Sequence, residues 1–263
     1  MDEKKKFKLV SSKKTRYLLP NILTLAGVCL GISSIKFSID GNFSLAVTLI
    51  MLAAILDALD GRIARLIKGT SEFGKELDSL TDFVSFGIAP VFILYFWELN
   101  NYGKLGWAIT LIYSVCCVLR LARFNLTKIE EAHAWKNNFF EGIPSPAGGL
   151  LILMPLIYEL TNLNIGLEIK KFTPYLTVLI ALLLVSKVPT LALKKISISP
   201  KATVFLLLGI GLVFISLLFY TLETLLIFGI MYLISIPFSI VIYSNQNKKN
   251  LEKISDDSHE DVL

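Results

Sequence analysis

The stretch DALDGRIARLIKGTSEFGKELDSLTD, residues 57–82, places four aspartates between segments that are otherwise strongly apolar. Asp57 and Asp60 close an apolar run that begins near residue 43, and Asp78 and Asp82 open another that continues to residue 99. An ionised carboxylate in apolar surroundings is costly unless a partner compensates it. The stretch therefore predicts something positive bound between two hydrophobic segments.

Composition indicates an integral membrane protein. Of the 263 residues, 54% are hydrophobic and 18% are charged, and the mean hydropathy is +0.65. A helix that crosses a hydrocarbon layer of ~30 Å needs roughly 20 mostly apolar residues. The apolar runs predict an all-α transmembrane bundle of about eight spans, at residues 18–35, 43–67, 77–99, 105–124, 145–160, 172–193, 202–220 and 222–243.

The basic residues set the predicted orientation. Cytoplasmic loops of membrane proteins carry an excess of lysine and arginine. Such residues gather in the leader and in alternate loops: Lys4, Lys5, Lys6, Lys8, Lys13, Lys14, Arg16, then Arg62, Arg65, Lys68, then Arg120, Arg123, Lys128, then Lys194, Lys195 and Lys201. We expect both termini in the cytoplasm, with a basic leader at 1–17, a transmembrane domain at 18–243 and a polar tail at 244–263. In a bacterium this is a multi-pass protein of the cytoplasmic membrane, with the aspartates on the inner side.

Several classes of function are disfavoured. The net charge of +5 is explained by basic residues on the cytoplasmic side, where they can meet anionic lipid headgroups. No nucleic-acid motif accompanies this charge, so a nucleic-acid-binding protein is disfavoured. Three cysteines, all within predicted spans, suggest no disulfide framework. The two histidines, His133 and His259, have no neighbouring ligand candidates and argue against a histidine-based zinc site.

The four carboxylates predict a cation site. Asp57 and Asp60 are one helical turn apart, and so are Asp78 and Asp82 on the next helix, so that two antiparallel helices can bring all four together. Hard divalent ions such as Mg²⁺ or Mn²⁺ bind carboxylate oxygens and keep positions for water and phosphate. Two ions held by carboxylates are a recurring device for displacement at phosphorus.

Two pairs of alternatives remain for this stretch, one for its small residues and one for its carboxylates. Gly61 and Ala64 either leave room for a ligand to approach the backbone or serve close helix packing. The carboxylates either hold a ligand or form a juxtamembrane charge cluster with Arg62, Arg65 and Lys75. Four carboxylates on adjacent helices favour the first interpretation, because ionisable residues at membrane depth are usually functional.

The spacing of this stretch resembles the signature of the CDP-alcohol phosphatidyltransferase family without departure. Its eight specified positions are Asp57, Asp60, Gly61, Ala64, Arg65, Gly74, Asp78 and Asp82. The resemblance implies that Asp57 and Asp78 bridge two divalent cations, Mg²⁺ or Mn²⁺. It implies that Asp60 completes the first site, and that Asp82 completes the second and acts as general base. The implied contacts to the cytidine diphosphate part are Gly61, Arg65, Ser71, Asn21 and Thr24.

Further segments narrow the resemblance. The blocks at 19–27 (LPNILTLAG), 120–125 (RLARFN), 142–148 (GIPSPAG) and 185–195 (VSKVPTLALKK) are similar to those of the membrane-bound phosphatidylserine synthases of this superfamily. The resemblance implies transfer of a phosphatidyl group from CDP-diacylglycerol to L-serine, with CMP as the other product. It also implies a homodimer, for which the sequence identifies no interface.

The acceptor must be held by other residues. Arg120 and Arg123 are one turn apart at the inner end of a span, where a guanidinium can pair with a carboxylate or serve as a positive-inside anchor. Ser145 is predicted to cap the helix that follows it, with exposed N–H groups that suit an anion. The RLARFN block adds Asn125 by resemblance. These four are the candidate serine-binding residues.

Three other functions remain open at this point. A sister transferase would use another alcohol, such as glycerol 3-phosphate or inositol phosphate, and would need a denser basic pocket. A cation transporter would place the carboxylates near mid-membrane and would not require the glycine spacing. A third alternative is a family member that has lost activity and serves as a structural partner.

Overall fold

A computed structural model describes residues 12–67, 71–127, 139–161, 168–191 and 200–260. The α-helices are α1 (Ser12–Ile39), α2 (Phe43–Leu66), α3 (Glu72–Asp82), α4 (Ala89–Trp97), α5 (Lys104–Thr127), α6 (Ser145–Ile152), α7 (Met154–Leu160), α8 (Thr173–Val185), α9 (Pro200–Phe219) and α10 (Thr221–Glu260). The remaining elements are the π-helix η1 (Phe83–Ile88), the 3₁₀ helices η2 (Leu99–Tyr102) and η4 (Ile169–Phe172), and the strands β1 (Phe139–Glu141) and β2 (Pro189–Leu191). Part of the basic leader and the predicted loop residues Lys68, Lys128, Lys194 and Lys195 lie outside the described residues.

The described part of the chain contains five helical segments long and apolar enough to cross a membrane. They are Leu18–Ile39, Phe43–Leu66, Glu72–Trp97, Lys104–Leu126 and Thr221–Ser244, and a shorter apolar helix covers Leu207–Phe219. The prediction of a multi-pass, mainly helical membrane protein is therefore confirmed. The predicted count of eight spans is not, because two of the expected spans are interrupted and the described part of another is short.

The interruptions follow from proline. The span predicted at 145–160 is divided between α6 and α7, and Pro155 stands at the start of α7, where it lacks the N–H that would continue α6. The span predicted at 172–193 ends as a helix at Val185, because Ser186 is extended and Pro189 begins β2. The expectation of helix up to residue 193 is wrong for this reason.

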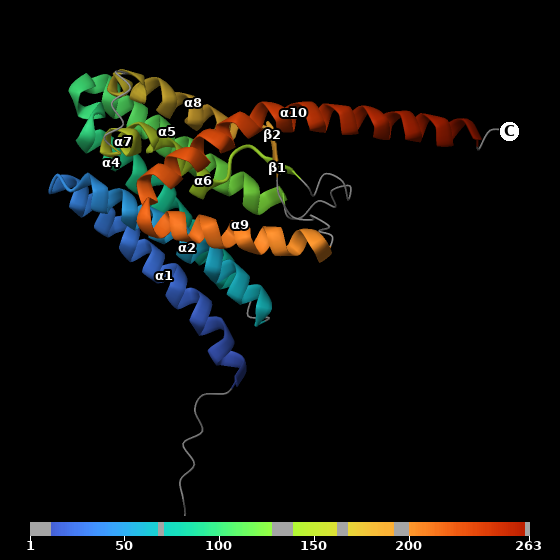
Figure 1. Cartoon of the computed structure of the whole chain (residues 1–263), viewed down its shortest axis with the longest axis horizontal. Coiled ribbons are helices and arrows are strands. Elements are labelled where there is room, and N and C mark those ends of the chain that lie inside the picture. Colours follow the sequence, from blue (N-terminus) through green and yellow to red (C-terminus); the bar gives the residue numbers. More distant parts are fainter. Residues whose placement is uncertain (1–11, 68–70, 128–138, 162–167, 192–199, 261–263) are drawn as a thin grey trace, which may run out of the picture.

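A short antiparallel ribbon departs from the all-helical prediction. β1 pairs with β2 so that Phe140 lies opposite Thr190. Strand pairing between segments about fifty residues apart depends on tertiary structure, and three-residue strands carry almost no sequence pattern. The ribbon ties the segment before α6 to the segment after α8, and α10 packs against β2 (Figure 1).

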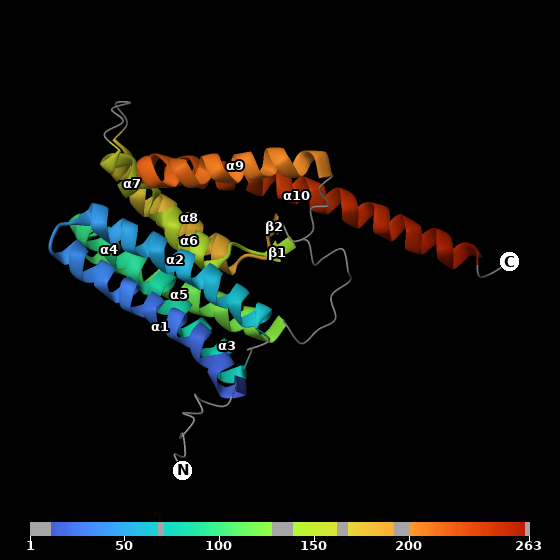
Figure 2. The same ribbon diagram turned by 60° about the horizontal axis from the view of Figure 1, so that its bottom comes forward.

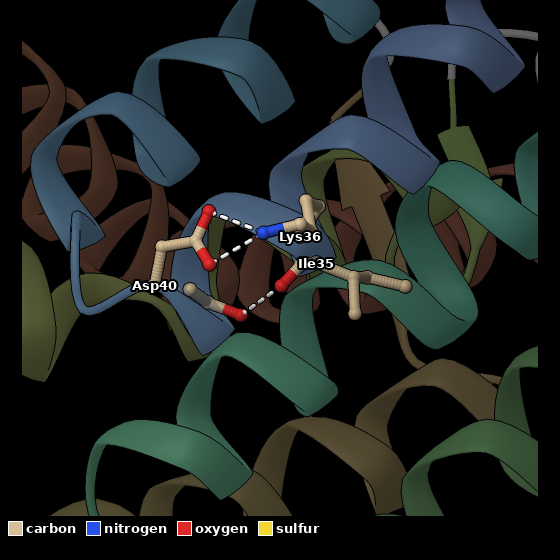
Figure 3. A network of polar contacts seen from close by, with 4 residues as sticks. Ile35, Lys36 and Asp40 are labelled. Carbon is tan, nitrogen blue, oxygen red and sulfur yellow. Dashed lines mark hydrogen bonds and ion pairs between the residues drawn. The ribbon is translucent and has the colours of Figure 1, made fainter.

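α1 and α2 form an antiparallel pair that packs against α3 and α4 (Figures 1 and 2). Between them, Gly41 takes a φ of 78°, and the Asn42 side chain accepts a hydrogen bond from the backbone N–H of Leu45 at 3.2 Å, which caps α2. At the end of α1, Lys36 Nζ lies 2.5 and 2.6 Å from the carboxylate oxygens of Asp40 (Figure 3). Both side chains are exposed, so this ion pair adds little to stability.

The core lies where α2, η1, α4, α5, α6, α7 and α8 meet. Its largest fully buried side chains include Ile50, Phe86, Tyr113, Leu153 and Ile180. α9 and α10 form a helical hairpin on one side of this core, and α10 extends past the other helices toward the C-terminus (Figures 1 and 2).

The π-helix η1 follows directly after Asp82 and has an identifiable cause. In an α-helix the carbonyl of Phe86 would pair with the N–H of residue 90, but Pro90 has none, and its ring crowds that carbonyl. The helix widens, so that Ala89 N–H bonds to Val84 O, five residues back. Two hydrogen bonds from α5 hold the segment. The Tyr113 hydroxyl donates to Phe86 O at 3.0 Å, and the Ser114 hydroxyl donates to Gly87 O at 3.2 Å.

Small residues bring α1 against η1. A Cβ added to Gly31 would lie 2.9 Å from Ser85 Oγ and 3.0 Å from its Cα, closer than side chains tolerate. The Ser85 hydroxyl also donates to Gly27 O at 3.2 Å. These glycines allow α1 to pack against the helix that carries Asp78 and Asp82.

We predict that Tyr113→Phe lowers the free energy of unfolding by about 1–3 kcal/mol, because it leaves the Phe86 carbonyl buried without its donor. Thermal unfolding of the detergent-solubilised protein measures the effect. Tyr220→Phe is the matched control, since Tyr220 is 64% exposed. Equal midpoints for the two variants would show that the hydroxyl does not support the π-helix.

Candidate active site

Carboxylates from α2 and α3 meet at one point. Single oxygens of Asp57, Asp60 and Asp78 all lie within 4.8 Å of one another. Asp60 is 3% exposed, and the other two are half-buried. Asp82, one turn beyond Asp78, contacts the Asp57 carboxyl group. The structure thus brings together all four aspartates that the spacing singled out; three of them form the tight group and Asp82 lies beside it.

The donor set fits a hard divalent cation. Among the described residues, Asp57 and Asp60 form no ion pair with a lysine or arginine, and the Arg120 guanidinium interacts with Asp82. Mutual repulsion of buried carboxylates requires positive charge nearby. Oxygen-only donors select Mg²⁺, Mn²⁺ or Ca²⁺ over zinc or copper.

Thr24 of α1 positions one of these carboxylates. Its hydroxyl lies 2.6 Å from Asp60 Oδ2 and 3.0 Å from Pro20 O, and the residue is 6% exposed. Hydrogen bonds from outside a metal site orient the ligands and tune the affinity. The resemblance implies that Thr24 lies near the nucleotide, and the structure places it both against Asp60 and on the wall of the adjoining pocket.

That pocket has a volume of about 340 Å³ and opens beside the carboxylates. Its wall contains all five residues assigned by resemblance to the cytidine diphosphate part, together with two aspartates and four residues not so assigned: Asn21, Thr24, Gly61, Arg65, Ser71, Asp60, Asp78, Pro20, Ala64, Gly74 and Lys75. From the sequence, Lys75 is expected only as a charge partner of the aspartates, yet it lies on the pocket wall next to the motif residue Gly74. Its place directly after that glycine is the sequence feature that could have predicted this position.

The glycines of the motif have different roles. A Cβ added to Gly61 would meet no atom within 4 Å, so helix packing does not require a glycine there. A Cβ at Gly74 would lie 3.1 Å from Ser71 Oγ and 3.3 Å from Asn21 Oδ1. Ser71 also caps α3, since its hydroxyl accepts from Gly74 N–H at 2.9 Å. Close packing therefore explains the glycine at position 74. It does not explain Gly61, where the open space belongs to the pocket.

The four candidate acceptor residues divide into three groups. Arg120 donates from Nη1 to the Ser145 hydroxyl, and its guanidinium interacts with the Asp82 carboxylate. Arg123 donates from Nη2 to Val185 O, at the end of α8. Asn125 donates from Nδ2 to Ser79 Oγ on α3 at 3.1 Å. Arg120 and Ser145 are in direct contact with each other, whereas the hydrogen bonds of Arg123 and Asn125 join them to α8 and α3.

The predicted capping role of Ser145 is wrong. Pro144 occupies the cap position with φ −59° and ψ 144°, and no side chain caps α6. Ser145 is the first helical residue and is fully buried. Its hydroxyl accepts from Arg120 instead, which links α6 to the inner end of α5.

Comparisons with known proteins agree with this geometry. A family model described as CDP-alcohol phosphatidyltransferase matches residues 17–241. The chain is 37% identical over 229 residues to the CDP-diacylglycerol–serine O-phosphatidyltransferase of Mycobacterium leprae (strain TN), covering 85% of this chain and 74% of that protein.

Proteins of the same name from two other bacteria are also similar. In Helicobacter pylori (strain ATCC 700392 / 26695) the identity is 35% over 219 residues, with 83% of this chain and 89% of the relative covered. In Mycobacterium tuberculosis (strain ATCC 25618 / H37Rv) it is 33% over 224 residues, with 85% and 78% covered. The similarity therefore extends over most of each protein.

We predict that Thr24→Val weakens Mn²⁺ binding about 10–100-fold, the usual effect of removing a hydrogen bond to a metal ligand. Isothermal titration calorimetry of the purified protein measures the affinity. Thr48→Val is the control, because the Thr48 hydroxyl bonds only within α2, to Ser44 O at 2.9 Å. Unchanged Mn²⁺ affinity in Thr24→Val would contradict the orienting role.

Proposed function

The chain belongs to the CDP-alcohol phosphatidyltransferase family, and from this premise we propose that it transfers the phosphatidyl group of CDP-diacylglycerol to L-serine. The products are phosphatidylserine and CMP. The observation that carries the proposal is the carboxylate group of α2 and α3 beside a pocket large enough for part of a nucleotide. The names of the similar proteins support serine as acceptor.

The aspartates would hold two divalent cations, Mg²⁺ or Mn²⁺. Asp57, Asp60, Asp78 and Asp82 would supply the carboxylate oxygens that hold them. When bound, the cations supply positive charge to the pyrophosphate and to the departing CMP. This assignment is supported by the oxygen-only donor set and by the absence of an ion pair to Asp57 or Asp60 among the described residues.

The pocket residues would bind and orient the donor. Arg65 and Lys75 offer positive charge to the phosphates, and the open space at Gly61 lets the nucleotide approach the backbone of α2. Asn21 and Ser71 supply polar groups on the opposite wall. Because protein groups mainly position reactants in phosphoryl transfer, a preformed pocket is the principal requirement.

Asp82 would act as general base. Its carboxylate lies between the Asp57 side chain and the Arg120 guanidinium, and its Oδ1 is buried without a hydrogen-bond partner among the described residues. The serine hydroxyl oxygen forms a bond to the diacylglycerol-linked phosphorus while the bond to the CMP oxygen breaks. CMP leaves with that electron pair, and the hydroxyl proton passes to Asp82.

Topology completes the proposal. Eight crossings result if α3, η1 and α4 count as one span and α6 with α7 as another, alongside α1, α2, α5, α8, α9 and α10. The basic leader at 1–17 and the tail at 244–263 would then both be cytoplasmic, with the transmembrane domain at 18–243. The site would open to the cytoplasmic face of the inner membrane of a bacterium, and the active form would be a homodimer.

Product formation from defined acceptors tests the function. Purified protein in mixed micelles with CDP-diacylglycerol and Mn²⁺ is expected to release CMP and form phosphatidylserine with L-serine. Little product is expected with glycerol 3-phosphate or inositol phosphate. A preparation carrying Asp82→Asn controls for contaminating activity. Turnover with either phosphorylated alcohol but not with L-serine would assign the chain to a sister reaction, and turnover with none would favour a structural role or a transporter.

Gly61→Ala tests whether the space beside residue 61 serves the ligand or the packing of the helices. Alanine is about 1 kcal/mol more favourable than glycine inside a helix, and the added methyl group meets no protein atom within 4 Å. We predict an equal or higher unfolding midpoint together with a raised KM for CDP-diacylglycerol. Gly211→Ala in α9 is the matched control, since its Cβ also meets nothing within 4 Å. The same KM in both variants would remove Gly61 from the donor pocket.

A further inference from the structure

Three polar atoms near the acceptor side are buried without a hydrogen-bond partner among the described residues. They are Asp82 Oδ1, Arg120 Nε and the Tyr232 hydroxyl oxygen. Most buried polar side-chain atoms in folded proteins are paired, and each orphan costs free energy. Orphans that gather in one place therefore indicate a ligand that supplies the missing partners.

These atoms belong to one electrostatic group. The Arg120 guanidinium interacts with the Asp82 carboxylate and with the Tyr232 hydroxyl. Its Nη1 is committed to Ser145, whereas its Nε remains unused. The three side chains come from α3, α5 and α10, so that only the assembled bundle brings them together.

The ring of Tyr232 is fixed by packing. It lines an apolar cavity of about 170 Å³ between α6, α7 and α10, where its neighbours include Leu150, Leu225 and Phe228. The ring therefore has an apolar setting of its own, while its hydroxyl faces the charged group around Arg120. An amphipathic side chain placed in this way usually finds a polar partner for its hydroxyl.

The nearest protein hydroxyl does not provide that partner. Thr190 of β2 interacts with Tyr232, but the geometry falls short of a hydrogen bond. The Thr190 hydroxyl instead donates to Gly142 O at 2.8 Å. Gly142 is itself fixed, with a φ of 72° and its N–H bonded to Val188 O at 2.8 Å. The ribbon thus holds Thr190 in place, and the Tyr232 hydroxyl keeps its hydrogen free.

We propose that Tyr232 is a further acceptor-binding residue, whose hydroxyl donates a hydrogen bond to the carboxylate of the acceptor beside the Nε–H of Arg120. The inference rests on the proposed function. Two unused donors, on Tyr232 and Arg120, match the two oxygens of an α-carboxylate, and one unused acceptor, on Asp82, matches a hydroxyl group. A small hydroxy amino acid carries this combination, whereas a phosphorylated polyol lacks the carboxylate.

Tyr232→Phe tests the proposal, because it removes the hydroxyl and keeps the ring. The KM for L-serine is expected to rise about tenfold or more, as for the loss of one charge-assisted hydrogen bond. The kcat and the KM for CDP-diacylglycerol should change little. The unfolding midpoint should stay equal or rise, because the hydroxyl makes no hydrogen bond within the protein whose loss would destabilise it.

Tyr175→Phe is the matched control, since Tyr175 on α8 is 76% exposed and lies outside the pockets described above. An unchanged KM for L-serine in Tyr232→Phe would overturn the inference. A parallel loss of kcat, donor affinity and thermal stability would overturn it in favour of a structural role. If the unmodified protein forms no phosphatidylserine from L-serine, the proposed function itself fails, and the two failures are thereby distinguished.

Discussion

Four carboxylates share a small volume between α2 and α3, where their negative charges repel one another. The neighbouring groups of the site compensate this repulsion. Carboxylates at membrane depth persist only where cations, hydrogen bonds or other charges compensate them. Here Thr24 donates toward Asp60 from α1, and the Arg120 guanidinium acts on Asp82 from α5. Arg65 and Lys75 add positive charge on the wall of the adjoining pocket, and the oxygen-only donor set of the aspartates fits divalent cations.

Asp82 connects two chemically different regions. On one side it contacts Asp57 and the carboxylate group that adjoins the donor pocket, and on the other it interacts with Arg120, whose guanidinium also interacts with Tyr232. The π-helix begins at the next residue, so the widening that Pro90 imposes sets how α3 continues into the bundle. Hydroxyl groups of α5 hold that widened segment, and the same helix carries Arg120. A single helix thus supports the base and the acceptor residue together.

The carboxylate group could be predicted from the sequence because it depends on local spacing. Aspartates one turn apart on two consecutive helices must come close if the helices are antiparallel neighbours, and a 26-residue stretch encodes both helices. The space for a ligand at Gly61 could be inferred from its place between the aspartates, whereas Arg65, Ser71, Asn21 and Thr24 were assigned to the pocket only by the resemblance. Thr24 and Asp60 are 36 residues apart in the chain, and no local spacing records which face of α1 turns toward α2.

Other features depend on contacts that no local pattern records. Tyr232 is about a hundred residues away from Arg120 in the chain, and an isolated tyrosine in an apolar span gives no signal. The ribbon of β1 and β2 joins two segments whose sequences show no strand pattern. Ser145 was wrongly predicted to cap α6, because a Ser-Pro pair is typical of a helix start. The hydrogen bond that its hydroxyl accepts from Arg120 depends on the packing of α5 against α6 and leaves no pattern in the sequence.

The number of divalent cations bound between α2 and α3 tests the central claim most directly. Equilibrium dialysis of the purified protein against Mn²⁺, with bound metal quantified by mass spectrometry, is expected to give about two ions per chain. Asp57→Asn should lose most of this binding, since Asp57 interacts with every other carboxylate of the group. A protein that binds no Mn²⁺, or an Asp57→Asn variant that binds as much as the unmodified chain, would contradict the account.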